Sequence, residues 1–327
     1  MILGPPMARG LRFGYPKGTP MSAPRVLIVR FSAIGDCVMA AWAATSIRGK
    51  HPDAFLCWAV EARCAPMVDG HQLVTQKVEF PRDKWKKQRW SPATWQEQLA
   101  KYTRMRSLRF DFGLDLQGHS KTALCLRVAR PRQRISVAAT DALARRLNPL
   151  LEPGDPDEHT VERNHRALRT FGEYVIPERP IMPEVPYEGD PNLVTLAVSA
   201  GQTEKAYPLE RWGALAESLI GSGYRVAFLG GPTDRAPEVA GAEDYVGKLP
   251  LRETLALVQA SRLHVASDTG TGHMAAAVGT PLISVFGPTD PAVFRPYTPR
   301  GVVLREGLSP ADVPLATVEA EARRMLL

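Results

Sequence analysis

The sequence has 327 residues, 44% of them hydrophobic and 23% charged, which is typical of folded globular proteins and excludes disordered, fibrous and coiled-coil classes. This length exceeds what one hydrophobic core usually organises, and no uncharged apolar run approaches the ~18 residues of a membrane-spanning helix, so we expect two non-spanning domains. The formal charge of +7 is concentrated in residues 1–190, which hold 29 Lys and Arg against 20 Asp and Glu, and predicts an anionic partner unless it reflects a generally basic proteome.

Residues 1–23 are rich in Gly and Pro and lack the compact apolar segment of a secretory signal. We interpret them as a disordered or non-native tail. The four cysteines show no CxxC pair and no zinc-type spacing, and this favours a reduced, cytoplasmic compartment.

Residues 24–175 alternate between strand and helix patterns. The apolar run at 26–29 predicts a strand buried on both faces of a parallel sheet, and the Ala-rich stretch 36–48 predicts the following helix. Further strands are expected at 55–60 and 112–116. The pattern is that of a Rossmann-like α/β domain.

Five prolines between 176 and 192 forbid helix and central strand, so we place a linker there. The alternation restarts at 193–309, with strands expected at 194–198, 225–229, 263–266 and 282–286 and helices at 209–221, 251–260 and 273–278. The sequence therefore predicts two doubly wound parallel-sheet domains that face each other across a cleft. We expect residues 310–327 to form a helix that packs back on the first domain.

Asp36 follows the first strand through the turn that contains Gly35. One interpretation is a first-turn carboxylate that stabilises the helix dipole, which is common. The other is a general base that faces the cleft and stays ionised because the helix N-terminus favours its charge.

Two loops of the second half carry residues suited to a phosphate. Lys205 follows the strand expected at 194–198, although a solvated surface lysine is the alternative. Residues 267–273 lead into an Ala-rich helix. The free N–H groups at the start of this helix, the small residue Gly270 and the hydroxyls of Thr269 and Thr271 together form a predicted diphosphate site. Asp268 could accept hydrogen bonds from sugar hydroxyls. His273 either contacts the bound donor or packs within the protein.

Other glycine motifs are weaker. Gly270 and Gly272 form only a fragment of GxGxxG, and the sequence contains no GxxxxGK[ST], which argues against dinucleotide and P-loop sites. Gly287 lies in a turn after a predicted strand and could close the same pocket.

Several segments in order resemble glycosyltransferase family 9, the ADP-heptose:lipopolysaccharide heptosyltransferases. They are RVLIVRFSAIGD at 25–36, DLQGHSKTA at 115–123, VERN from 161, the loop that ends in Lys205, SDTGTGH at 267–273 and VFGPTDP at 285–291. Because all of them occur in register, the resemblance is specific.

The resemblance implies a GT-B fold and an inverting, metal-independent transfer of heptose from ADP-L-glycero-D-manno-heptose, with no cofactor. It implies that Asp36 is the base, that Lys205 and the backbone around Thr269 and Gly270 hold the departing ADP, and that Asp268 holds the heptose. The adenosine part is expected near Gly230 and Gly231, with Gly287 completing the donor pocket.

The implied acceptor is the anionic Kdo and inner-core region of lipopolysaccharide, bound through residues of the first half: Ser32, Gly35, Gln117, Gly118 and Lys121. A stretch of Trp and Lys at 84–95 would suit peripheral contact with the cytoplasmic face of the inner membrane. The alternative for this stretch is a solvated helix whose tryptophans pack inward.

Three other functions are alternatives to this transfer. A nicotinamide-dependent dehydrogenase would need an intact GxGxxG after an early strand, where this sequence has SAIGD at 32–36. A glycosyltransferase of the same fold could use another nucleotide sugar. A non-catalytic protein could keep the fold and bind anionic glycolipid without turnover.

Overall fold

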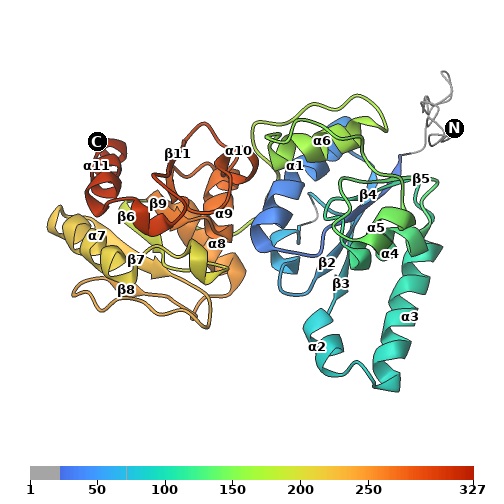
Figure 1. The fold of residues 1–327 in the computed structure, drawn as a ribbon, viewed down its shortest axis with the longest axis horizontal. Coiled ribbons are helices and arrows are strands. Elements are labelled where there is room, and N and C mark those ends of the chain that lie inside the picture. The colour runs from blue at the N-terminus through green and yellow to red at the C-terminus, as the bar shows by residue number, and fades with distance from the viewer. Residues whose placement is uncertain (1–22, 71) are drawn as a thin grey trace, which may run out of the picture.

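The computed structural model describes residues 23–70 and 72–327, so the predicted tail lies outside the described residues except for Ala23. Two parallel β-sheets lie in separate halves of the molecule, each covered by helices on both faces (Figure 1). The predicted pair of doubly wound α/β units is confirmed. The chain passes from one half to the other through residues 173–189, which form neither helix nor strand.

The first half has the strand order β3-β2-β1-β4-β5, with every pair parallel. Its strands are β1 (Arg25–Val29), β2 (Phe55–Glu61), β3 (Gln76–Phe80), β4 (Phe112–Asp115) and β5 (Gln133–Ser136). Its helices are α1 (Ile34–Lys50), α2 (Arg82–Lys87), α3 (Pro92–Ser107), α4 (Ser120–Ala129), α5 (Ala142–Leu147) and α6 (Thr160–Arg169), with a 3-10 turn η1 (Ala65–Met67).

Residues of β1 alternate between two hydrophobic clusters, which explains why this strand is apolar throughout. Val26 and Ile28 pack with residues of α1 and α6, whereas Leu27 and Val29 pack with residues of α3 and α4. Side chains of consecutive strand residues point to opposite faces, so a sheet covered on both sides needs an unbroken apolar run.

The second half repeats this arrangement with the strand order β11-β10-β9-β6-β7-β8. Its strands are β6 (Asp190–Ala197), β7 (Arg225–Leu229), β8 (Glu243–Asp244), β9 (Ser261–Ser267), β10 (Leu282–Val285) and β11 (Gly301–Leu304). Its helices are α7 (Leu209–Gly221), α8 (Leu251–Ala260), α9 (Gly270–Val278), α10 (Pro291–Phe294) and α11 (Leu315–Leu326), with 3-10 turns η2 (Thr203–Lys205) and η3 (Pro310–Asp312).

The expectation that residues 310–327 pack back on the first domain is wrong. Helix α11 packs on α7, β9 and β10 of the second half, on the side of the molecule away from the first half (Figure 1). Val318, Ala322 and Leu326 are buried there together with Trp212 of α7. Its apolar face is therefore used by its own sheet and is not free to cover the first half.

Helices α1 and α9 join the two halves. Val38, Met39 and Trp42 of α1 form one apolar cluster with Met274 and Ala277 of α9. Because α1 contacts its own sheet on one side and α9 on the other, it is buried almost all round, as a helix without a polar face should be. This contact brings the loops after β1 and β9 together.

Candidate active site

A cavity of about 450 Å³ lies between the loops at the strand ends of the two halves. Both sheets contribute to its wall, as expected for parallel sheets that bind ligands at the carboxyl ends of their strands. The first half supplies Ala33, Gly35, Asp36, Met39 and Arg63, and the second half supplies Gly201, Gln202, Lys205, Asp268, Thr269, Gly270, His273, Thr289 and Phe294.

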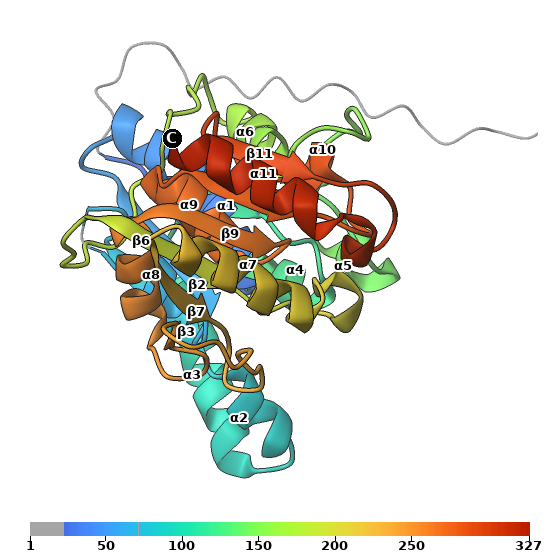
Figure 2. The ribbon, with the colours of Figure 1, turned by 90° about the vertical axis from the view of Figure 1, so that its left-hand side faces the viewer.

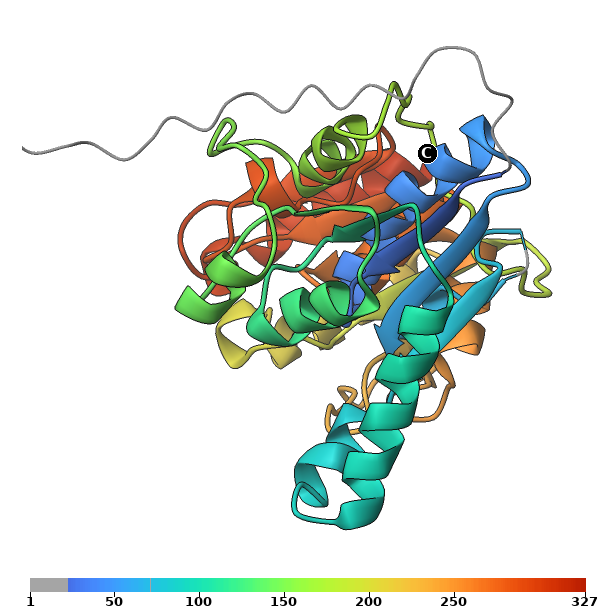
Figure 3. The ribbon, with the colours of Figure 1, turned by 90° about the vertical axis from the view of Figure 1, so that its right-hand side faces the viewer.

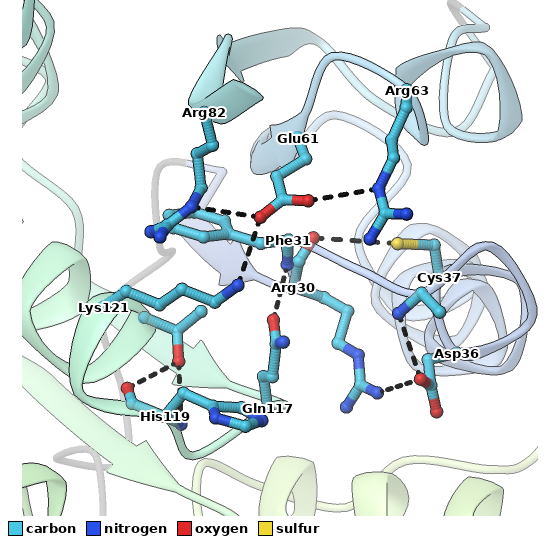
Figure 4. Close-up of polar contacts among 12 residues, drawn as sticks. Arg30, Phe31, Asp36, Cys37, Glu61, Arg63, Arg82, Gln117, His119 and Lys121 are labelled. Carbon is cyan, nitrogen blue, oxygen red and sulfur yellow. Dashed lines mark hydrogen bonds and ion pairs between the residues drawn. The ribbon is translucent and has the colours of Figure 1, made fainter. Parts of the chain in front are cut away.

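Asp36 lies in the first turn of α1, because the helix begins at Ile34, two residues before the predicted start. Its Oδ2 accepts a hydrogen bond from the N–H of Ala33 at 3.1 Å and pairs with Arg30 Nη2 at 2.6 Å (Figure 4). Burial raises the pKa of Asp36, but the charge of Arg30 and the Ala33 N–H outweigh burial and lower the pKa below its ordinary value. The carboxylate is therefore ionised at neutral pH.

Arg30 is a site residue that the sequence analysis missed. It directly follows β1, and its guanidinium also donates from Nη1 to the carbonyl of Leu116, while its Nε finds no hydrogen-bond partner among the described residues. A charged residue directly after a buried strand was the available signal. Nothing in the sequence indicated that it pairs with a side chain six positions later.

His273 packs against the turn that carries Asp36. A Cβ atom at Gly35 would lie 2.5 Å from His273 Cδ2, so only glycine leaves room for the ring. Burial lowers the pKa of His273, although the charges of Asp268 and Asp36 act in the opposite direction. The imidazole is thus neutral near pH 7 and fills the contact between α1 and α9 while lining the cavity.

Lys205 and Asp268 form an ion pair on the wall opposite Asp36. Lys205 Nζ lies 2.7 Å from Asp268 Oδ2, and the hydroxyl of Thr289 donates to the same oxygen at 2.7 Å. The side chains of Lys205 and Asp268 are 21% and 9% exposed, so water screens this pair less than a surface pair. Thr289 was not singled out from the sequence.

The N-terminus of α9 opens into the same cavity. The helix begins at Gly270, three residues before the predicted start, and Thr269 and Gly270 line the cavity beside Lys205. Free N–H groups of a first helical turn carry partial positive charge and suit an anion. Together with the Lys205 ammonium they can stabilise a diphosphate.

Several predicted site residues lie outside the lining of this cavity. The hydroxyl of Thr271 contacts Thr269 Oγ1 at 3.0 Å and the buried His264 at 3.1 Å. Gly231 follows β7 and donates to Ser199 Oγ at 2.9 Å, and Gly230 precedes it. Gly287 packs tightly against Pro310. The donor roles assigned to these residues stay predictions.

The predicted acceptor residues, apart from Gly35, lie around the ends of β1 and β4. Ser32 is buried, and Gln117 accepts a hydrogen bond from the N–H of Phe31 at 2.9 Å. Gly118 has φ of +79° and donates to Asp115 Oδ1 at 3.0 Å. Lys121 points to Glu61 at the end of β2, beside a second cavity (Figure 4).

Within residues 23–70 and 72–327, no group of three or more His, Cys, Asp or Glu side chains is arranged to hold a metal ion. In the same part of the chain, no helix combines the length and apolarity needed to cross a membrane. The four cysteines are buried and free.

The sequence model of glycosyltransferase family 9 (heptosyltransferase) matches residues 98–313. Lipopolysaccharide heptosyltransferase 1 of Pseudomonas aeruginosa is 28% identical over 289 residues, which cover 84% of this chain and 81% of the relative. Lipopolysaccharide heptosyltransferase 1 of Escherichia coli K12 is 27% identical over 299 residues, which cover 86% and 93%.

Solved structures of heptosyltransferases are also similar to this chain. An Escherichia coli heptosyltransferase with ADP has a TM-score of 0.79 at 23% identity and covers 92% of this chain and 99% of its own. A family 9 glycosyl transferase from Veillonella parvula has a TM-score of 0.77 at 14% identity, with coverages of 95% and 99%. These likenesses show the GT-B arrangement of two Rossmann-like domains.

Because Arg30 lowers the pKa of Asp36, its replacement should change how activity depends on pH. In Arg30→Gln the burial that raises the pKa of Asp36 remains while the charge that lowers it is gone, so the carboxylate protonates at a higher pH. We expect the acid limb of the kcat/KM profile for the catalysed reaction to move to higher pH, since this profile reports the free enzyme.

Arg30→Lys keeps a cation at this position and serves as the matched control, with a profile near that of the parent. An unmoved acid limb in Arg30→Gln, whatever happens to the maximal rate, would show that Arg30 has no influence on the ionisation of Asp36.

Proposed function

Because this chain belongs to glycosyltransferase family 9, we propose that it transfers heptose from ADP-L-glycero-D-manno-heptose to the Kdo and inner-core region of lipopolysaccharide. The names of its relatives support lipopolysaccharide as the acceptor. Two likenesses with TM-scores of 0.79 and 0.75, an Escherichia coli heptosyltransferase with ADP and the same enzyme with ADP-2-deoxy-2-fluoro heptose, support the donor.

One observation carries the mechanism: a single cavity has a carboxylate from the first half on one wall and a cation with a helix N-terminus from the second half on the other. Asp36 takes the proton of the acceptor hydroxyl as its oxygen bonds to the anomeric carbon. The bond from that carbon to the diphosphate breaks on the opposite face, and its electrons leave with ADP. Attack and departure on opposite faces invert the anomeric centre.

The second half stabilises the departing ADP. Lys205 and the first-turn N–H groups of α9 neutralise the charge that develops on the diphosphate, a role that a metal ion plays in other transferases. Asp268 holds hydroxyl groups of the heptose once Lys205 turns toward the phosphates. We also propose that the reaction needs neither a metal ion nor a further cofactor. The rate of transfer should therefore be unchanged in the presence of EDTA.

The first test replaces the base. Asp36→Asn keeps an oxygen for the Ala33 N–H but cannot accept the proton, so we expect kcat to fall by about 10²–10⁴-fold with the affinity for ADP unchanged. The assay follows heptose transfer from ADP-heptose to Kdo-lipid A. Asp53→Asn, at an exposed turn of the same half, is the control and should keep the parent rate.

Full activity of Asp36→Asn would refute the base. A parent protein that binds Kdo-lipid A but never releases ADP would instead favour the non-catalytic glycolipid-binding function. Transfer from a different nucleotide sugar would correct the donor.

The second test replaces the cation. Lys205→Gln removes a charge-assisted contact with the diphosphate and leaves Asp268 without its cation, so we expect the Kd for ADP to rise by roughly 10- to 100-fold. Calorimetric titration with ADP measures this directly. Lys248→Gln, an exposed lysine of the same half that pairs with Asp244, should bind ADP as the parent does, and equal affinities for all three proteins would exclude Lys205 from the donor site.

We include in the proposal a peripheral contact with the cytoplasmic face of the inner membrane. The arrangement of helices α2 and α3 supports it. They project from the first half beyond the rest of the molecule in Figure 1 and in the two views perpendicular to it (Figures 2 and 3). Trp85 packs inward, but Trp90, Trp95 and Leu99 are 78%, 61% and 69% exposed. Exposed cations flank them at Lys86, Lys87 and Arg89, so the surface combines amphipathic rings with positive charge, as anionic headgroups require.

The third test removes these rings. Trp90→Ser/Trp95→Ser should lower partitioning onto vesicles of phosphatidylethanolamine and phosphatidylglycerol by at least about tenfold, because each indole that enters the interface buries a large apolar area. Sedimentation with the vesicles measures the bound fraction. Leu308→Ser, at a site 75% exposed in the second half, is the control, and equal binding of parent and double variant would refute this surface.

A further inference from the structure

His159, the N-cap residue of α6, joins the first half of the molecule to the second. Its Nδ1 accepts a hydrogen bond from the N–H of Val161 at 3.1 Å, and its Nε2 lies 2.8 Å from the carbonyl oxygen of Arg295. Burial lowers the pKa of His159 to about 4, so the ring is neutral at pH 7. Because Nδ1 accepts, Nε2 carries the proton and donates to the Arg295 carbonyl.

Tyr297, two residues beyond Arg295, makes a second contact between the halves. The centre of its ring lies 4.8 Å from that of His159 and 5.8 Å from that of Trp42 in α1, and its hydroxyl donates to Glu162 Oε1 at 3.4 Å. Aromatic rings at such separations attract each other in addition to burying apolar area. The chain around Arg295 is therefore held by side chains of the first half.

The segment 289–297 also forms part of the cavity wall that the second half supplies. It begins at Thr289, whose hydroxyl donates to Asp268, and continues through α10 to Phe294, and both Thr289 and Phe294 line the cavity. A helix of only four residues is not stable by itself, so the position of α10 depends on the contacts at its two ends. One end contacts Asp268, and the other contacts His159.

Packing alone does not fix this segment. A cavity of about 460 Å³ lies beside it, lined by Arg295 and Tyr297 of the segment and by Glu162 and residues 176–178 on the facing side. Side chains that border such a space have no protein contacts in that direction and lose the dispersion attraction of close packing. The hydrogen bond and the ring contact of His159 therefore determine where the segment lies.

We propose that His159 is a positioning residue of the donor site. By holding the Arg295 carbonyl it fixes the segment 289–297, so that Thr289 keeps Asp268 oriented toward the sugar of the donor. This role rests on the proposed function, which assigns Asp268 to the heptose. The share of donor affinity that comes from the heptose should depend on His159, whereas the affinity for ADP should not.

Two substitutions separate this role from the capping of α6. In His159→Asn the side chain can still accept from the Val161 N–H, since Asn is a favoured N-cap residue, but it is too short to reach Arg295. In His159→Gln the longer side chain places its amide nitrogen near the position of the histidine Nε2 and can donate to Arg295.

Calorimetric titration without acceptor compares ADP-heptose with ADP. We expect His159→Asn to raise the Kd for ADP-heptose by about tenfold, the loss of one buried hydrogen bond, and to leave the Kd for ADP unchanged. His159→Gln should bind both ligands as the parent does. His51→Asn, which replaces a histidine at the C-cap of α1 that contacts Tyr174, is the control and should also match the parent.

Hydrogen exchange of the backbone amides in the segment 289–297 tests its position without donor or turnover. The amides of Val293, Phe294 and Arg295 donate to carbonyls within this segment, so their exchange reports whether α10 keeps its place. Exchange there should be about tenfold faster in His159→Asn and unchanged in His159→Gln, with β1 and β9 unchanged in both.

Parent exchange rates and parent affinity for ADP-heptose in His159→Asn would overturn the positioning role. A loss in His159→Gln as large as that in His159→Asn, or larger, would overturn it too, since the effect would then not follow the contact with Arg295. A parent protein that does not transfer heptose refutes the proposed function, and the exchange rates decide the positioning of the segment 289–297 in either case.

Discussion

The close contact between the first turns of α1 and α9 is the constraint on which the candidate site depends. Two glycines permit it: Gly35 leaves room for the His273 ring, and a Cβ at Gly270 would lie 3.1 Å from Ile34 Cγ2. The apolar cluster around Trp42 and Met274 stabilises the same contact further along both helices. Because each helix starts at the end of a central strand, packing them together places two strand-end loops around one cavity.

Each wall of that cavity carries a charged side chain that is paired with an opposite charge from the same half. Arg30 pairs with Asp36 on one side, and Asp268 pairs with Lys205 on the other. The effects differ. Arg30 is buried and fixed by the carbonyl of Leu116, so it keeps the Asp36 carboxylate ionised and in place, whereas Lys205 is more exposed and, in the proposed mechanism, exchanges Asp268 for a more strongly charged diphosphate.

Much of the fold was predictable because buried parallel strands need continuous apolar runs. The starts of α1 and α9 were predicted late, since Gly35, Gly270 and Gly272 disfavour helix in isolation and only the close packing of the two halves explains them. The partners of Asp36 and Lys121 were not predictable from the sequence. Arg30 directly follows β1 and Glu61 ends β2, and their contacts follow from the strand order, which puts β2 and β4 on either side of β1.

The tryptophans between 84 and 95 show the same limit of sequence reasoning. Two interpretations were open, an inward-packed helix or an amphipathic surface, and the structure divides the residues between them: Trp85 packs on Phe80, whereas Trp90 and Trp95 face solvent. Trp85 also lines the second cavity, together with Arg82 and Lys121. The projecting helices and the cations that pair with Glu61 are therefore continuous. Because Arg63 lines both this cavity and the one that contains Asp36, the cations around Glu61 lie between the projecting helices and Asp36.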